Sequence, residues 1–373
     1  VTGLVGSEMC IRDSFSTMAP TVSFWDTGEF IATSHILGVP HPPGSPLFLL
    51  VGKFFSLIPI SSDISFRVNI FSPIISALTI SLLFLICNQF IDRIDPSDNN
   101  KFFKMWSSLT ASLTFAFTHS HWFNAVETEV YAFSGFMTAL VVFLIMRWSQ
   151  KIHDSNHIIY LIFISYIIGL ATGLHLLNLL TIPFIGLIIY FSIGKLSTKN
   201  LILTFIFSLI IFFGIQSVII KGLPQLTASL GLVGLSFLII LWVITTIYSI
   251  KSNKTFLSIF LSSVLLIVIG YSTYFAIFIR SGQNPNIDEN NPETISEAIS
   301  YLNRDQYGQM TILPRKFDNL PSKISIVGSP ADDNSQFSFD QELDYMFHDI
   351  PSQASFLWNY QIKKMYLLSL IHI

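Results

Sequence analysis

Charge is scarce in this chain of 373 residues. Charged residues make up 12% of the sequence, hydrophobic residues make up 51%, and the mean hydropathy is +0.60. Soluble domains carry about twice that share of charge, so the composition indicates an integral membrane protein. The 35 phenylalanines are spread along the whole chain, so no single segment accounts for the bias. The formal net charge is only −3, and we expect no nucleic-acid partner.

Cysteine and the common nucleotide motifs are also missing or nearly so. The two cysteines are Cys10, near the start, and Cys87, inside an apolar run, which argues against a disulfide framework and a cysteine-based metal site. The sequence has no P-loop and no Gly-x-Gly-x-x-Gly, so it indicates no nucleotide cradle. Gly-x-Ser-x-Gly is absent as well, which removes the usual sign of a serine hydrolase.

The two ends differ in composition from the rest of the chain. The opening VTGLVGSEMCIRDS (1–14) and the closing LLSLIHI (367–373) resemble translated sequencing-adaptor read-through, and we interpret both as artefactual. The chain is then expected to be a fragment that lacks a preceding transmembrane helix. Residues 357–366 are interpreted as the start of a truncated following segment.

Long apolar runs dominate what remains, and they predict an all-α polytopic membrane protein. About eight spans are expected in a transmembrane bundle over residues 67–280, since a span needs about 20 apolar residues. The expected spans are 69–90, 102–117, 130–148, 158–174, 176–193, 201–220, 226–248 and 256–279. The shorter apolar run 46–60 is predicted to be a juxtamembrane or re-entrant helix.

Basic residues orient these spans. If the loop at 92–101 lies inside, the loops on its side contain nine basic residues, whereas the short loops on the other side contain only Lys221. Because basic loops stay in the cytoplasm, residues 15–66 form a first external loop and residues 281–356 an external soluble region. Within the latter, 294–303 is predicted to be a helix, preceded by a suitable Asn-Pro-Glu start.

The stretch 24–48 gathers ionisable residues in an otherwise apolar chain. Asp26, Glu29, His35 and His41 lie within sixteen positions. If residues 25–37 are helical, the two carboxylates share one face and His35 lies about two turns further along. The His-Pro-Pro-Gly at 41–44 cannot continue a helix and predicts a rigid turn. A solvated loop is the alternative, but the aromatic residues that flank the carboxylates favour a partly buried site.

A second polar cluster, HSHWFNAVETEVY (119–131), is predicted on the same face of the membrane. It contributes Glu127 and Glu129, and ionisable groups at membrane depth usually line a cavity. His119 and His121 are two residues apart, a weak signal for a metal pair in a strand or loop. We favour hydrogen bonding to a phosphate or a carboxylate for these two histidines.

Two further residues could contact an anionic lipid headgroup. His175 lies at the tip of a tight hairpin between two spans, where it could equally be satisfied by backbone carbonyls at a helix end. Arg280 closes the last span, where guanidinium could bind phosphate in a bidentate manner or simply anchor the helix at the membrane surface.

Four stretches resemble a known family. TVSFWDTGEFIATSHILGVPHPPGSPLF resembles the signature of a bacterial family of multi-pass proteins related to the protein O-mannosyltransferases, which belong to the GT-C glycosyltransferases. HWFNAVETEVYAF, GLATGLHLLNLLTIP and NPNIDENNPE…YLNRDQYG resemble it in the same order, so the resemblance runs from about residue 15 to 366. It implies a GT-C-like helix bundle whose first span is missing here.

The resemblance also implies an activity. The family transfers a mannose-like sugar from a polyprenyl-phosphate donor to a hydroxyl of an exported protein or glycan, at the periplasmic face of the bacterial inner membrane. Asp26 matches the essential acid of the first external loop and is expected to act as the base, with Glu29 beside it and inversion at the sugar. The expected substrate-binding residues are His35, His41, Glu127, Glu129, His175 and Arg280. No metal ligands are predicted, and the need for a divalent metal is left open.

Two other classes of function fit the architecture. A transporter or flippase of lipid-linked sugars would also be polytopic, but it should pair charges near the bilayer midplane and often has an inverted repeat. A structural or sensor protein could bind partners through the acidic external region. The carboxylates at span ends favour the enzyme.

Overall fold

The computed structural model describes residues 13–95, 100–193, 196–308, 358 and 362–363. The expected artefactual ends lie outside these residues, except for 13 and 14, and so do 309–356 of the external region and most of 357–366. The chain divides into two units, Val1–Arg304 and Asp305–Ile373. The description below concerns the first unit.

Helices form almost all of the first unit, and the predicted all-α class is confirmed. The described residues contain no strand, only an isolated bridge between Val39 and Asp288. The helices are α2 (Thr27–Ile36), α3 (Pro46–Leu57), α4 (Ile64–Asn69), α5 (Phe71–Ile94), α6 (Lys101–Ala116), α7 (His119–Ala125), α8 (Val130–Gln150), α9 (Ile158–Thr172), η2 (Leu176–Leu180), α10 (Thr181–Ile193), α11 (Thr198–Gly214), η3 (Ile215–Ile220), α12 (Gly222–Lys251), α13 (Thr255–Tyr271), η4 (Ser272–Tyr274), α14 (Phe275–Ser281) and α15 (Ile295–Asn303).

Several of these helices are long and apolar enough to cross a membrane. In the described part of the chain five such segments occur: Ile64–Ile94, Val130–Gln150, Leu176–Ile193, Thr198–Lys251 and Thr255–Ser281. Pro46–Leu57 and Ile158–Thr172 are apolar but shorter. The chain is therefore a multi-pass membrane protein, and the apolar run at 46–60 contains a helix, Pro46–Leu57, that is shorter than a span, as the length of the run suggested.

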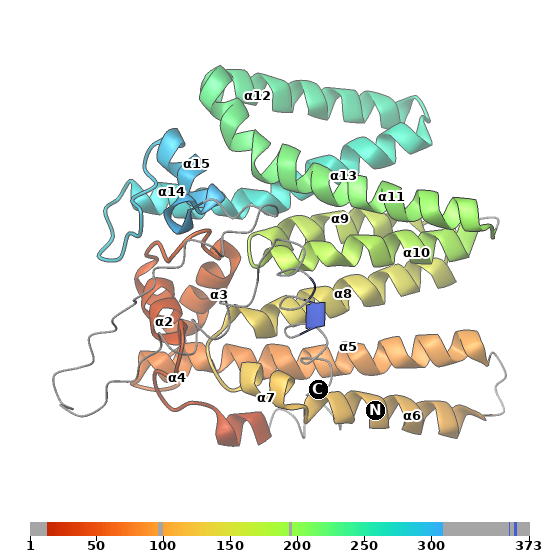
Figure 1. Cartoon of the computed structure of the whole chain (residues 1–373), viewed down its shortest axis with the longest axis horizontal. Coiled ribbons are helices and arrows are strands. Elements are labelled where there is room, and N and C mark those ends of the chain that lie inside the picture. Colours follow the sequence, from red (N-terminus) through yellow and green to blue (C-terminus); the bar gives the residue numbers. More distant parts are fainter. Residues whose placement is uncertain (1–12, 96–99, 194–195, 309–357, 359–361, 364–373) are drawn as a thin grey trace. The chain divides into compact units, whose positions relative to one another are not determined.

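The reversal expected at residues 221–225 occurs elsewhere. Thr198–Lys251 is almost continuously helical through that stretch, and the non-helical backbone lies at Gly231, with φ 66° and ψ 173°. A residue with a side chain would be strained at this positive φ, whereas glycine adopts it freely. Figure 1 shows α12 folding back at this bend before α13 runs the other way. The sequence prediction missed this because apolar residues flank the bend on both sides.

Small residues let the central helices approach closely. A Cβ added to Gly169 of α9 would meet the backbone of Ile267, and one added to Gly270 of α13 would meet the backbone of Leu170 and Gly169. Close backbone approach at small residues is the usual way that membrane helices associate, because lipid provides no hydrophobic drive for pairing. The buried core continues through α8, η2 and α10, with Ile145 of α8 and Leu179 of η2 fully buried.

The two ends of the long helices differ in character. At one end, α2, α14 and α15 lie together, on the left in Figure 1. The other end carries basic side chains, where Lys104 pairs with Asp92 at 3.1 Å and Lys151 pairs with Asp154 at 3.0 Å. The ionisable residues of the 24–48 stretch are thus at the opposite end of the bundle from these ion pairs.

Candidate active site at the start of α2

The predicted helix over 25–37 is present as α2. It starts directly after Asp26 and ends at Leu37, which adopts a left-handed conformation. Glu29 lies in the first turn, where the positive end of the helix dipole favours a carboxylate. The Asp26 side chain is exposed and accepts no hydrogen bond from any described residue. Asp26 is therefore open to a ligand, whereas Glu29 is held by the protein.

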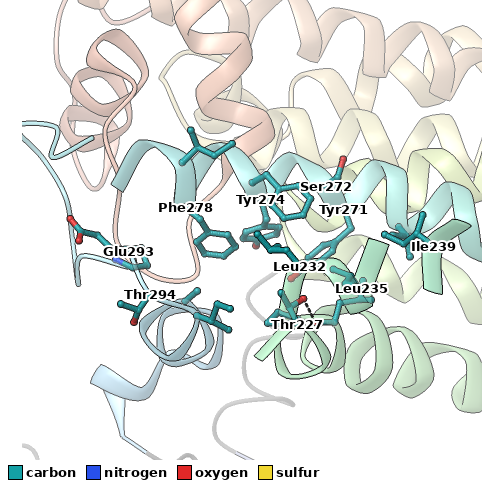
Figure 2. Close-up of a pocket in the computed structure, with 18 residues that line it drawn as sticks. Thr227, Leu232, Leu235, Ile239, Tyr271, Ser272, Tyr274, Phe278, Glu293 and Thr294 are labelled. Carbon is teal, nitrogen blue, oxygen red and sulfur yellow. Dashed lines mark hydrogen bonds between the residues drawn. The ribbon is translucent and has the colours of Figure 1, made fainter. Parts of the chain in front are cut away.

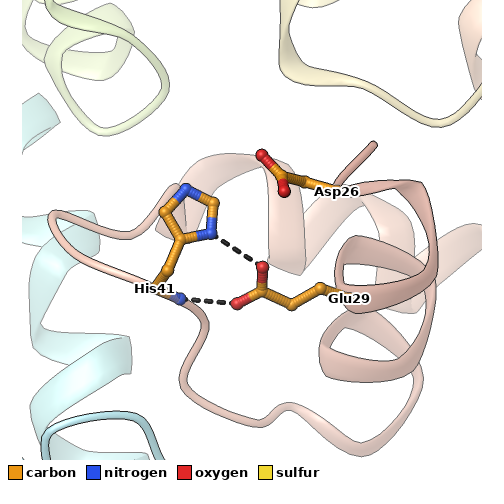
Figure 3. A group of neighbouring side chains, drawn as sticks. All are labelled: Asp26, Glu29 and His41. Carbon is orange, nitrogen blue, oxygen red and sulfur yellow. Dashed lines mark hydrogen bonds and ion pairs between the residues drawn. The ribbon is translucent and has the colours of Figure 1, made fainter. Parts of the chain in front are cut away.

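Glu29 and His41 form the best-defined contact of the site (Figure 3). The backbone N–H of His41 donates to Oε1 of Glu29 at 2.6 Å, and Nδ1 of His41 lies 2.7 Å from Oε2. Burial opposes ionisation of Glu29, but these hydrogen bonds and the attraction of His41 outweigh it and lower the pKa of Glu29. The side-chain hydrogen bond that His41 makes to the Glu29 carboxylate raises the pKa of His41 against the effect of burial. The pair thus favours ionised Glu29 and protonated His41.

The His-Pro-Pro-Gly turn is held by α15, which sequence reasoning did not connect to it. The hydroxyl of Tyr301 donates to the carbonyl of Pro40 at 2.6 Å. Gly44 lies against the same hydroxyl with φ +74°, a conformation that glycine adopts without strain. Tyr301 is 1% exposed, so the side chain that fixes the turn is itself fixed by the core.

The segment after α14 supports the same turn through its backbone. The N–H of Val39 donates to the carbonyl of Ile287 at 2.8 Å, and the N–H of Glu289 donates to the carbonyl of Val39 at 3.1 Å. A short backbone pair of this kind does not produce the alternation of apolar and polar side chains by which a strand is predicted from sequence. It explains why part of the expected soluble region, residues 281–304, belongs to the site and not to a separate domain.

The second acidic cluster meets the first. The hydroxyl of Ser23 donates to Oε2 of Glu127 at 2.7 Å, and the backbone N–H of Asp26 interacts with the Glu129 carboxylate. Burial, together with the charges of Asp26 and Glu127, raises the pKa of Glu129 to about 7 despite the hydrogen bond from Val130. Glu127 is 2% exposed, and its Oε1 has no hydrogen-bond partner among the described residues.

Backbone and amide contacts explain why the two clusters lie together. The side-chain amide of Asn69, at the end of α4, donates to the carbonyls of Ala19 and Thr21 at 2.8 and 2.9 Å. Its carbonyl oxygen accepts from the hydroxyl of Thr128. The N–H of Ala19 donates to the carbonyl of Val126 at 2.9 Å. Asn69 is fully buried, so it joins the segment before α2 to the loop before α8.

Three of these side chains offer ligand atoms at metal-binding separations. One ligand atom each from Asp26, Glu29 and His41 lies within 4.8 Å of the others. Figure 3 shows the Asp26 carboxylate turned toward the space beside the His41 ring and the Glu29 carboxylate. The arrangement can accept a proton from a substrate hydroxyl, bind a cation, or do both.

Comparison with known proteins matches this part of the chain. Residues 26–199 match the family described as "Protein O-mannosyl-transferase TMEM260 N-terminal domain". The matched region begins at Asp26 and includes both acidic clusters. The match supports an O-mannosyltransferase-like family for these residues.

Two curated relatives carry the same description. The chain is 29% identical over 189 residues to "Protein O-mannosyl-transferase tmem260" of Dictyostelium discoideum, covering 47% of this chain and 22% of that protein. It is 30% identical over 126 residues to "Protein O-mannosyl-transferase TMEM260" of Mus musculus, covering 34% of this chain and 16% of that protein. The similarity thus covers less than a quarter of either relative's length. No solved structure matches the chain.

His35 and His175 lie apart from the three-residue group. Nδ1 of His35 is 3.4 Å from the hydroxyl of Ser56, so its ring packs against α3. Nδ1 of His175 accepts from the N–H of Leu177 at 3.2 Å and so caps the start of η2, instead of donating to backbone carbonyls as the helix-end alternative proposed. Burial, with a smaller effect of the Arg304 charge, lowers the pKa of His175. Its ring lies 5.5 Å from that of Tyr131, one residue into α8.

Arg280 binds the C-terminal end of α2. Its Nε donates to the carbonyl of Leu37 at 2.8 Å, and a terminal nitrogen donates to the carbonyl of Ile36 at 3.2 Å. The other terminal nitrogen donates to the side chain of Gln283. A guanidinium at this position also complements the negative end of the helix dipole. A phosphate contact of Arg280 would therefore compete with the hydrogen bonds that its guanidinium makes to the end of α2.

We predict that Arg280→Ala destabilises the protein by about 1–3 kcal/mol, because two carbonyls at the end of α2 lose a charged donor. Thermal unfolding in detergent measures this. Arg147→Ala is the matched control, because among the described residues the exposed Arg147 side chain bonds only to Gln150, and its loss should change stability by less than about 0.5 kcal/mol. Equal unfolding midpoints for the two variants would remove the structural role.

His119 and His121 do not form the strand or loop pair considered for a metal. Both belong to the short helix α7, where residues two apart point in different directions. The His119 ring stacks on Phe123 at 6.1 Å, and the His121 ring lies 4.9 Å from Phe115. Burial lowers the pKa of His121 to about 4, and its Nε2 has no hydrogen-bond partner in the described part of the chain. His121 is thus a neutral, packed ring.

This burial predicts a pH dependence of stability. Because the pKa of His121 is about 4 in the folded protein and about 6.5 when unfolded, protonation favours unfolding. The contribution of His121 to the free energy of unfolding should be constant above pH 6.5 and fall by about 1–3 kcal/mol toward pH 4, while Glu129 and His41, whose pKa values are raised, titrate separately. The difference in unfolding midpoint between the wild type and His121→Phe isolates this contribution and should change between pH 6.5 and pH 4, whereas the difference for the exposed control His153→Phe should not. The same difference between wild type and His121→Phe at both pH values would contradict the assignment.

Proposed function

We propose that this protein transfers a mannose-like sugar from a polyprenyl-phosphate donor to a hydroxyl of an exported protein or glycan. The observation that carries the proposal is the meeting of the two acidic clusters at one end of the membrane helices, within the part of the chain that matches the O-mannosyl-transferase family. The uneven distribution of basic residues supports a site on the non-cytoplasmic face. Nucleotide sugars are not available there, so a lipid-linked donor is the natural activated sugar.

The acceptor side of the reaction centres on Asp26. An exposed carboxylate to which no described residue donates a hydrogen bond can take the proton of a hydroxyl as the hydroxyl oxygen attacks the anomeric carbon. Glu29 already accepts two hydrogen bonds from His41. Its proposed role is therefore to hold the turn at His41 in place and to keep a negative charge beside Asp26. A single displacement of this kind inverts the configuration at the sugar. Glu127 and Glu129 are proposed to shape the acceptor side.

The donor side has an apolar pocket of about 360 Å³ close to the same helix that holds the turn (Figure 2). Its lining comes from α12, the α13–α14 region and α15, and includes Leu235, Tyr274 and Phe278. Ala298 of α15 also lines it, and Tyr301 lies one turn further along the same helix, bonded to Pro40 beside His41. We propose that the lipid chain of the donor occupies this pocket, with its phosphate toward the turn.

The leaving group is a lipid phosphate, so charge stabilisation matters more than a strong acid. His41 is the basic side chain at the carboxylates, and the contacts of His175 and Arg280 make them secondary candidates. His35 packs on α3, which favours a supporting role at the far end of α2.

A transfer assay tests the proposal. Purified protein in liposomes would be given polyprenyl-phosphate mannose, or in parallel a nucleotide-linked mannose, with a Ser- and Thr-rich acceptor peptide. We expect mannosyl peptide only from the lipid-linked donor. Product from the nucleotide sugar alone, or flipping of the lipid without product, would contradict the proposal.

A further inference from the structure

His175 presents a hydrogen-bond donor in a defined tautomer. Its Nδ1 accepts from the backbone N–H of Leu177 at 3.2 Å, and an imidazole nitrogen that accepts a hydrogen bond carries no proton. Burial, and then the charge of Arg304, lowers the pKa of His175, so the ring is neutral near physiological pH. The one N–H of the neutral ring is therefore at Nε2. This Nε2–H donates to no described residue, so it is available to a ligand.

The hairpin that ends in His175 is fixed against the His-Pro-Pro-Gly turn. The buried hydroxyl of Ser45 donates to the carbonyl of Leu174 at 3.0 Å, and the backbone N–H of Leu47 donates to the carbonyl of Gly173 at 3.0 Å. These hydrogen bonds join the end of the turn to the residues directly before His175. His175 therefore borders the proposed active site from the side of η2.

Arg304 ends α15 in a backbone conformation that arginine rarely adopts. It is the C-cap residue, with φ 61° and ψ 37°, and its N–H donates to the carbonyl of Tyr301 at 3.1 Å. Glycine or asparagine is usual at such a left-handed cap, because a longer side chain strains the backbone there. The backbone gains nothing from arginine at this position, so the strain points to a role for its exposed guanidinium.

Helix α15 also brings Arg304 to the turn. Tyr301, about one helical turn before Arg304, donates its hydroxyl hydrogen bond to the carbonyl of Pro40 at 2.6 Å. The charge of Arg304 acts on the ring of His175, so the guanidinium and the imidazole are close enough to contact one ligand. A permanent positive charge beside a neutral N–H donor suits an oxyanion, above all a phosphate.

We propose that His175 and Arg304 bind the phosphate of the lipid-linked donor. This inference rests on the proposed function and names the residues that hold its leaving group. Ala298 of α15 lines the apolar pocket assigned above to the lipid chain, and Arg304 lies six residues further along the chain, about 9 Å along the helix axis. A lipid chain in the pocket would thus have its phosphate at the end of α15, next to the turn that carries His41.

The two side chains meet the charge that develops in the reaction. The acceptor oxygen forms the new bond to the anomeric carbon and gives its proton to Asp26. The bond from the anomeric carbon to the phosphate oxygen breaks, and its electron pair stays on that oxygen. Arg304 and the Nε2–H of His175 stabilise the added negative charge without transferring a proton. Arg280, whose guanidinium already donates to the end of α2, is not needed for this role.

Binding of a polyprenyl phosphate tests the subsite without any transfer reaction. The full chain in nanodiscs would be titrated with fluorescent polyprenyl phosphate and with fluorescent polyprenol of the same chain length. We expect the wild type to prefer the phosphate by about tenfold or more, and Arg304→Gln to lose most of that preference. Arg147→Gln is the control, because it removes an exposed arginine at the basic end of the bundle and should keep the preference.

Two further variants separate phosphate binding from folding. Glycine adopts the left-handed cap freely, so Arg304→Gly should keep or raise the unfolding midpoint and still lower the preference for phosphate by about tenfold. In His175→Asn the side-chain oxygen can accept from the N–H of Leu177, so the cap is kept while the Nε2–H is lost. We expect its phosphate preference to fall by about threefold or more. A wild-type preference in either variant would overturn the subsite.

Two comparisons show which part of the account is at fault if a result disagrees. Displacement of the polyprenyl phosphate by inorganic phosphate at equal concentration would overturn the lipid as the source of the phosphate. A phosphate preference that depends on Arg304, in a protein that transfers no mannose, would contradict the proposed function and leave the subsite in place. Mannose transfer by a wild type that binds polyprenol and polyprenyl phosphate equally would overturn the subsite alone.

Discussion

Asp26→Asn is expected to lower glycosyl transfer by roughly two to four orders of magnitude, the usual contribution of a positioned base. The amide has nearly the same shape but accepts no proton at neutral pH. The Asp26 side chain is exposed and has no hydrogen bond to any residue that the structure describes, so the variant should fold with an unchanged unfolding midpoint. The measurement is the initial rate of mannose transfer from a polyprenyl-phosphate donor at saturating acceptor.

The control for this variant is Asp154→Asn, which removes an exposed carboxylate far along the bundle and should retain full activity. Glu29→Gln offers a second comparison, because glutamine can still accept from the His41 N–H while losing charge. It should reduce transfer less than Asp26→Asn does. Wild-type rates in Asp26→Asn would remove the catalytic assignment.

Gly44→Ala is expected to disable the site through the backbone. The alanine Cβ would lie 2.6 Å from the hydroxyl of the buried Tyr301, and φ +74° is strained for any residue with a side chain. The two effects together should cost about 2–4 kcal/mol of stability. Because the turn carries His41, transfer should fall with it. Unfolding midpoint and transfer rate are the two measurements.

Gly135→Ala supplies the matched control. Gly135 lies within α8, a Cβ there meets nothing within 4 Å, and alanine is the better helix former, so stability should hold or rise slightly. Adding Tyr301→Phe to Gly44→Ala should recover part of the loss, because it removes the clashing oxygen but also the bond to Pro40. If Gly44→Ala proved as stable as Gly135→Ala, the proposed tight contact at the turn would be wrong.

Local patterns were the reliable part of the sequence. The helix at 25–37 was predictable because its carboxylates, its aromatic flanks and the following His-Pro-Pro-Gly define both ends. The helix at 294–303 was also predictable, and Thr294 and Glu297 form a capping box at its start. These features depend on residues close in sequence, so their physical signal is contained in one short window.

Long-range contacts were beyond such reasoning. Sequence position indicated that the acidic clusters share a face, but not that Ser23 bonds to Glu127 or that Asn69 joins the two segments. Tyr301 gave no sign that it holds Pro40, because an aromatic residue on a helix stripe usually belongs to a core. A buried hydroxyl needs a hydrogen-bond partner, and that requirement is the one signal that could have prompted a search for the partner of Tyr301.

The contacts of single residues were also hidden from the sequence. Arg280 was interpreted either as a phosphate contact or as a membrane anchor, and neither interpretation included the carbonyls of Ile36 and Leu37 to which its guanidinium donates. The bend at Gly231 was hidden because hydrophobicity is alike on both sides of it. The position of a charged side chain depends on which nearby backbone groups lack a hydrogen bond. Those groups are determined only once the helices have packed.

The central claim is that the space around Asp26 and the turn at 41–44 receives the phosphate and sugar of a lipid-linked donor. Photo-crosslinking with a polyprenyl-phosphate sugar analogue that carries a diazirine at its head, followed by peptide mass spectrometry, measures this directly. We predict labelling within residues 24–45 and 127–131, suppressed by excess unlabelled donor. Labelling confined to the opposite end of the bundle, near Lys104 and Lys151, would contradict the claim.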